Sequence, residues 1–314
     1  MASTPQGRRL TEEHRQAQVR LRARFLTGFL LLWPLLDWRR LDDTTPGWVQ
    51  AVLALLRPFR QESADLAVSY YRDYRLVEAP RATEPVPEVE FVQPAPTRPL
   101  TSGQLLDELA RRRRLDAQAT RSAPPSTPQR RAQPGELVKP RIDWSEWDKA
   151  AERSLLATGP GELKRQASRG IGEGQARRVA LVTSSGSASR HVLTGARETT
   201  LTLIRSDERA KRWVRVTDDD PCSFCAMLAS RGPVFITQAT AAFKAHDNCA
   251  CVAEPVFNLA AAWPGRAREF RRLWDDNIMG KYSGHEAVKA WRRLYEAQRR
   301  EQGRTGPAEN PLSA

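Results

Sequence analysis

All four cysteines of this 314-residue chain lie within one stretch of 30 residues, and one of its four histidines lies among them. A C-x-x-C turn can bring two thiolates to one metal ion, and a His-x-x-Cys segment can supply a second pair of ligands. Zinc takes four tetrahedral ligands, mostly thiolate and imidazole, at spacings of this kind. The pattern therefore predicts a zinc site with five candidate ligands, namely Cys222, Cys225, His246, Cys249 and Cys251.

Five candidates compete for four places in such a site. We expect Cys222, Cys225, His246 and Cys249 to bind the ion, with Cys251 as the contender. Two other interpretations stay open, which are buried thiols without a metal and disulfides, although a reducing compartment disfavours disulfides. Ligation by four protein groups leaves no open position, so the expected role of zinc is structural and not catalytic.

Composition excludes several classes of protein. With 40% hydrophobic residues the chain is too apolar for a wholly disordered protein. The longest apolar run, residues 29–36, contains a proline and is shorter than the roughly 20 residues of a membrane span. We therefore expect no membrane partner and assembly in a cytoplasm.

The net charge of +13 has two explanations. A basic surface would suit nucleic acid, whereas GC-rich coding would enrich arginine throughout. The excess is +3, +3 and +7 over residues 1–80, 81–140 and 141–314, so it is spread evenly and favours coding bias. The densest cluster, Arg111–Arg114, is expected on the solvated face of a short helix.

The periodicity of apolar residues predicts a mainly α-helical chain with a small α+β zinc knuckle. Four regions are expected: an N-terminal helical hairpin (1–80), a Pro-rich linker with one short helix (81–140), a domain that carries the cysteines (141–260), and C-terminal helices with a tail (261–314). Helices are predicted over residues 10–33, 46–75, 102–115, 144–159, 162–182, 187–210, 266–277 and 285–302, and strands over 88–92 and 213–216.

Two details of this prediction can be checked residue by residue. Thr11 is expected to cap the first helix. The core of the knuckle is expected to contain Trp213, Phe224, Met227, Leu228, Val234 and Phe235.

The cysteine stretch and its flanks resemble the phage head morphogenesis family, the Mu F-like minor capsid proteins, and within it the branch found in tailed phages of actinobacteria. The family pattern is C-x-x-C followed by His-x-x-Cys-x-Cys and a proline. Arg197 and Asp207 lie where the family has a helix that leads into the motif. The resemblance covers about residues 140–260 and rests on Trp213-Val214-Arg215-Val216-Thr217-Asp218, Pro221-Cys222-Ser223-Phe224-Cys225, His246-Asp247-Asn248-Cys249-Ala250-Cys251 and Pro255-Val256-Phe257.

This resemblance implies a structural minor head protein, present in few copies in the virion, at the portal or the inner capsid. Its implied partners are the portal protein, the major capsid protein, or both, with packaged DNA as a further partner. Members of the family are linked to head assembly, DNA packaging or delivery of material with the DNA. Some similar phage proteins are described as capsid maturation proteases, so that role is one alternative. A zinc-containing DNA-binding protein is another.

Catalytic motifs are weak in this sequence. Ser187 and His191 would share a helical face, with Ser185 and Ser189 nearby, but such neighbours are common. Neither His-Glu-x-x-His nor a G-x-x-x-x-G-K-[ST] loop occurs. The three carboxylates of residues 218–220 are expected to form a turn and not a Mg²⁺ site, and the glycines at 170, 172 and 174 a flexible break. We therefore expect no enzyme activity, with the maturation protease as the alternative.

Overall fold

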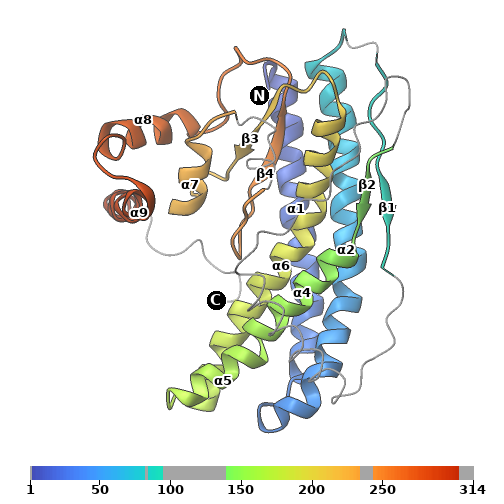
Figure 1. The fold of residues 1–314 in the computed structure, drawn as a ribbon, viewed down its shortest axis with the longest axis vertical. Coiled ribbons are helices and arrows are strands. Elements are labelled where there is room, and N and C mark those ends of the chain that lie inside the picture. The colour runs from blue at the N-terminus through green and yellow to red at the C-terminus, as the bar shows by residue number, and fades with distance from the viewer. Residues whose placement is uncertain (1, 82–83, 95–138, 234–242, 304–314) are drawn as a thin grey trace. The chain divides into compact units, whose positions relative to one another are not determined.

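The computed structural model describes residues 2–81, 84–94, 139–233 and 243–303, which are mainly helical (Figure 1). The helix predicted over residues 102–115, with its cluster Arg111–Arg114, lies outside the described residues, as do Val234 and Phe235. In chain order the main elements are α1 (Pro5–Leu32), α2 (Leu41–Glu78), β1 (Glu90–Val92), β2 (Arg141–Asp143), α4 (Ser145–Thr158), α5 (Pro160–Ser168), α6 (Glu173–Ser206), β3 (Arg212–Val216), α7 (Ser223–Ala229), β4 (Val252–Val256), α8 (Ala267–Asn277) and α9 (Gly284–Glu301).

The chain divides into two compact units. Unit 1 combines Met1–Thr27, Leu56–Val89 and Ser185–Ala314, and unit 2 combines Gly28–Leu55 and Glu90–Ser184. The N-terminal helices therefore contribute residues to both units. Within the described residues, no helix has the length and apolarity that crossing a membrane requires.

The first helix begins earlier than its apolar pattern suggested. The Gly7 amide donates to Thr4 Oγ1 at 2.9 Å, so Thr4 supplies the capping contact. The prediction that Thr11 caps this helix was wrong. Thr11 is buried inside α1, and its hydroxyl donates to Glu254 Oε2 at 2.7 Å. This hydrogen bond across the core of unit 1 explains why a polar threonine is buried at this position.

Helix α6 corrects the prediction of two helices over residues 162–182 and 187–210. The break lies earlier, at Gly170, whose φ of +72° is in the left-handed region that favours glycine. From Glu173 the helix runs without interruption to Ser206. Gly174 is inside it and does not break it, because one glycine costs only about 1 kcal/mol in a helix.

A second glycine of α6 permits close helix packing in unit 1. A Cβ atom at Gly195 would lie 2.2 Å from the Arg60 carbonyl oxygen of α2. We expect Gly195→Ala to lower the free energy of unfolding by about 1–3 kcal/mol, because a backbone atom must move. Gly174→Ala is the control, since nothing lies within 4 Å of its added Cβ. Urea unfolding should show that change as neutral or stabilising, and equal losses for the two would contradict the packing argument.

Unit 2 contains a parallel strand pair and an aromatic core. Strand β1 pairs with β2, with Phe91 opposite Ile142, which confirms a strand in the region predicted over residues 88–92. The rings of Phe91 and Trp144 stack with centroids 5.9 Å apart. Trp48 packs edge-on against Trp33, and Gly159 leaves room for its ring.

Unit 1 contains the antiparallel pair β3–β4 and the helix α7 (Figure 1). The predicted strand at residues 213–216 is confirmed, and its register places Val214 opposite Glu254. Strand β4 was not predicted, because Pro255 and the buried Glu254 interrupt the expected apolar alternation. This sheet and α7 form the small α+β part of a mainly helical protein.

The core around α7 differs from the predicted one. Trp213 and Phe224 do pack with the cysteines, as predicted, and Phe243 joins them. Met227 and Leu228 instead pack with residues of α8 and α9. Two hydrogen bonds hold α9 to the start of α7: Trp291 Nε1 donates to the Ser223 carbonyl at 2.7 Å, and the Tyr295 hydroxyl donates to the Pro221 carbonyl at 2.9 Å.

Candidate metal centre

The five predicted ligands come together in unit 1. Cys222 precedes α7 and Cys225 lies in its first turn, whereas His246, Cys249 and Cys251 belong to the segment that leads into β4. Cys222 and His246 are half-buried, and the other three are buried. All four cysteines are free thiols. The structure thus unites residues that are up to 29 positions apart.

Cys225 is the shared member of this cluster. The ligand atoms of Cys222, Cys225 and His246 lie within 4.8 Å of one another, and so do those of Cys225, Cys249 and Cys251. His246 Nε2 is 2.8 Å from Cys222 Sγ and 3.2 Å from Cys225 Sγ. The sulfur atoms of Cys225 and Cys249 are 3.5 Å apart, well beyond the ~2.05 Å of a disulfide. The cluster could hold a metal ion, and which candidate is not a ligand stays a prediction.

The C-x-x-C turn stabilises a thiolate at Cys222. The backbone amide of Cys225 donates to Cys222 Sγ at 3.4 Å, as such turns commonly do. Hydrogen bonds from the Cys225 thiol and from His246 lower the pKa of Cys222 to about 4. A deprotonated sulfur at neutral pH is the form that binds metals.

His246 is oriented as a ligand through Nε2. Its Nδ1–H donates to the carbonyl oxygen of Asp247, which turns Nε2 towards the sulfur atoms of Cys222 and Cys225. Metal-binding histidines commonly donate their other ring N–H to a carbonyl or carboxylate in this way. The neighbouring Cys222 thiolate raises the pKa of His246 to about 9. A positive charge at Nε2 is therefore stabilised.

The turn between His246 and Cys249 is held by contacts with α6 and α1. Asn248 has a φ of 62°, and a Cβ atom at Gly186 of α6 would lie 2.9 Å from its Nδ2. Arg190 of α6 pairs with Asp247 at 2.8 Å. Arg22 of α1 donates to the Asn248 carbonyl at 3.2 Å. The ligands on this turn are thus positioned by helices far away in the sequence.

Two buried arginines adjoin the sulfurs. Arg197 Nη2 donates to the Cys249 carbonyl at 2.6 Å, and its Nε donates to the Cys251 carbonyl at 3.3 Å. Arg215 Nη1 is 3.9 Å from Cys249 Sγ, and both guanidinium groups lie over the Phe243 ring. Hydrogen bonds from the Cys225 and Cys251 thiols, together with these cations, lower the pKa of Cys249 well below its ordinary value.

Sequence reasoning missed Arg215 and Phe243 as parts of the site. Arg197 was singled out only through the family resemblance. The one available signal was a charged residue within the apolar run of β3, where Arg215 stands between Val214 and Val216. Phe243 carries no signal, because its role depends on the approach of α6 and β3.

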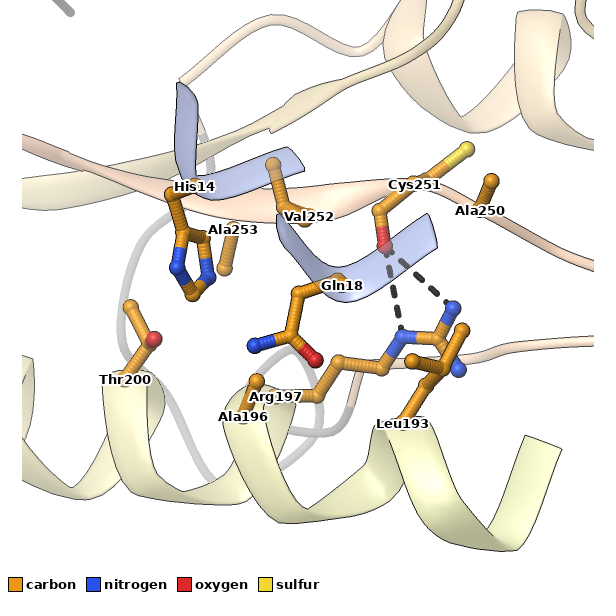
Figure 2. Close-up of a pocket in the computed structure, with 10 residues that line it drawn as sticks. All are labelled: His14, Gln18, Leu193, Ala196, Arg197, Thr200, Ala250, Cys251, Val252 and Ala253. Carbon is orange, nitrogen blue, oxygen red and sulfur yellow. Dashed lines mark hydrogen bonds between the residues drawn. The ribbon is translucent and has the colours of Figure 1, made fainter. Parts of the chain in front are cut away.

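Figure 2 shows a small cavity behind Cys251, between side chains of α1, α6 and β4, with Arg197 bonded to the Cys251 carbonyl. Its volume is about 10 Å³. That is room for at most one water molecule. This side of the cluster has no space for a small-molecule substrate.

Arg197 offers a test of how the ligand segment is held. We expect Arg197→Lys to weaken metal binding by about 10–100-fold, because lysine keeps the charge but cannot reach both carbonyls. Competition with a chromophoric chelator, at a temperature where both proteins are folded, measures the metal affinity of the variant and of the wild type. Arg205→Lys, near the end of α6, is the control. Unchanged affinity in Arg197→Lys would show that the carbonyl contacts do not orient the ligands.

The other sequence candidates do not assemble into a site with these five. Ser185, Ser187, Ser189 and His191 are buried on α6. Within the described residues Ser187 Oγ has no hydrogen-bond partner, so no Ser187–His191 bond forms, and burial lowers the pKa of His191 to about 3.

The three carboxylates before Cys222 have separate surroundings. Asp220 pairs with Arg299 of α9 at 2.6 Å. Burial raises the pKa of Asp218. Neither belongs to a group of potential metal ligands in the described part of the chain.

Residues 148–276 match the family model of the VG15 protein, a phage-associated family. The matched region is less than half of the chain and contains all five candidate ligands. This match supports the interpretation that a phage encodes the chain, and it does not distinguish a Mu F-like head morphogenesis protein from other phage proteins. No match was found among curated proteins or among solved structures.

Proposed function

We propose that this chain is a minor capsid protein of a tailed phage, and that one structural zinc ion holds its cysteine-bearing segment together. The observation that carries the proposal is the convergence of four thiols and one imidazole inside the region that matches a phage-associated family. The role is structural and belongs to head assembly, at the portal or the inner capsid of the virion.

The donor set favours zinc. Thiolate with imidazole suits zinc, whereas carboxylate and carbonyl oxygens suit magnesium and calcium. In a tetrahedral zinc site the sulfur–sulfur edge is about 3.8 Å and the sulfur–nitrogen edge about 3.6 Å. The Cys225–Cys249 distance of 3.5 Å is close to the first value, and the His246 distances of 2.8 and 3.2 Å widen on binding.

The charges around the cluster favour a single ion. One Zn²⁺ with three or four thiolates has a net charge of about −1 or −2. Arg197 and Arg215 supply two buried positive charges beside Cys249. They compensate such a centre and would repel a second metal ion.

A structural role follows from what the cluster connects. α7, β3 and β4 are short elements, and the cysteines form part of the core that they share. Zinc binding contributes folding free energy in small elements of this kind. A centre that stabilises a fold suits an assembly protein that binds the portal, the major capsid protein or both.

The proposal is tested on particles of the phage that encodes this chain. Quantitative mass spectrometry of purified heads is expected to find the protein at low copy number, and it should co-purify with the portal after mild disassembly. Tails prepared in parallel are the control. Absence from both immature and mature heads would overturn the capsid role. Elemental analysis that finds no zinc in the purified protein would overturn the zinc centre.

A further inference from the structure

The N-terminal half of α8 forms one wall of a basic groove in unit 1. The groove has a volume of about 400 Å³ and is lined by Trp263, Arg268, Arg271 and Arg272. Among the described residues, no acidic side chain lines it. A cation-lined groove attracts an anionic ligand.

Two of these arginines are available to such a ligand. Arg271 pairs with Asp275 at 2.7 Å. Arg268 and Arg272 are exposed, and within the described residues neither is paired with a carboxylate. They are four residues apart on α8, so their side chains share one face of the helix.

Trp263 positions the first of these two cations. The Arg268 guanidinium lies over the Trp263 ring, 5.7 Å from its centroid. The ring is itself held in place, because it packs over Gly232, where a Cβ atom would lie 2.4 Å from it. A guanidinium held on a fixed aromatic face loses less conformational freedom when it binds a ligand.

The lining selects the class of anion. Interfaces between proteins have an apolar core surrounded by a polar rim, whereas among the described residues that line this groove only Trp263 is apolar. Phosphodiester groups need only charge and N–H donors, which paired guanidinium groups supply. We propose that Arg268 and Arg272 contact neighbouring phosphates of duplex DNA, with Trp263 orienting Arg268.

This contact deepens the proposed function and rests on it for the identity of the polyanion, the packaged DNA. It differs from the arginine cluster at residues 111–114 that the sequence made prominent. Since phosphates carry no sequence information, binding is independent of base sequence and falls steeply with salt.

The test uses the full-length protein and a fluorescent duplex of about 30 base pairs with arbitrary sequence, titrated at several salt concentrations. In Arg268→Gln/Arg272→Gln, the slope of log K against log salt is expected to be shallower by about 1.8, since each lost phosphate contact removes about 0.9. Arg293→Gln/Arg300→Gln on α9 removes the same charge from other exposed positions and should keep the wild-type slope.

Three outcomes would overturn the DNA contact: an unchanged slope in the α8 double variant, an equal loss in the α9 control, or displacement of the duplex by poly-glutamate as effectively as by unlabelled DNA. The head experiment is independent of these. If the protein is found in heads but the α8 double variant keeps the wild-type salt slope, the capsid role stands and the DNA contact is refuted. If the protein is absent from heads but the salt slope of the α8 double variant is shallower, the DNA contact stands and the capsid role is refuted.

Discussion

Replacing Cys225 by serine is expected to remove the zinc ion and to unfold β3, α7 and β4. Cys225 is buried and belongs to both groups of potential ligands, so its loss affects either choice of the fourth ligand. Structural zinc contributes about 10 kcal/mol or more of apparent binding free energy in zinc-finger peptides. The effect should therefore exceed that of any single packing contact in this core.

Elemental mass spectrometry and hydrogen exchange measure this result. The variant should contain no zinc and lose amide protection in β3, α7 and β4. Ser223→Ala is the matched control, because the substitution keeps the backbone carbonyl of Ser223, which accepts a hydrogen bond from Trp291. A Cys225→Ser protein that retained one zinc ion per chain and its wild-type melting temperature would refute the proposed centre.

The second large effect is expected at a buried ion pair in unit 1. Arg75 Nε donates to Asp207 Oδ2 at 2.6 Å, and the Tyr71 hydroxyl donates to the same oxygen at 3.0 Å. The two charged side chains are 4% and 2% exposed. Asp207→Ala leaves the Arg75 charge buried without a partner, so the free energy of unfolding should fall by about 3–5 kcal/mol.

Chemical denaturation can show whether the loss of stability comes from the burial of this ion pair or would follow from breaking any ion pair. Glu296→Ala breaks the exposed pair with Arg292 on α9 and should cost less than about 1 kcal/mol. The double variant Arg75→Met/Asp207→Leu should recover most of the stability lost in Asp207→Ala, because no lone charge remains. An Asp207→Ala loss as small as that of Glu296→Ala would contradict this account.

The helices show how much of the secondary structure can be predicted from local sequence patterns. The periodicities over residues 266–277 and 285–302 predicted α8 and α9 to within a residue or two at each end, because their apolar stripes and flanking glycine and proline are local signals. The same reasoning divided α6 in two. Buried serines and threonines on that helix interrupt its apolar stripe, so the stripe by itself does not show that the helix is continuous.

The ligand set and its surroundings show the same division. Spacing predicted Cys222 with Cys225, and His246 with Cys249, as two pairs of ligands, because C-x-x-C and His-x-x-Cys are patterns of short segments. The partners of those segments could not be predicted. Strand β4 pairs with β3 across 35 residues, and Glu254 within it accepts a hydrogen bond from Thr11, 243 positions away.

Local patterns were sufficient to predict the mainly helical class, the positions of most helices and the chemistry of the candidate metal ligands, since each depends on residues close together in the chain. Local patterns did not reveal that Arg197 and Arg215 lie beside the cysteine segment, or that α1 and α6 hold the His246–Cys249 turn. These arrangements depend on contacts between distant segments. Their energies come from burial and charge compensation, and no local pattern encodes them.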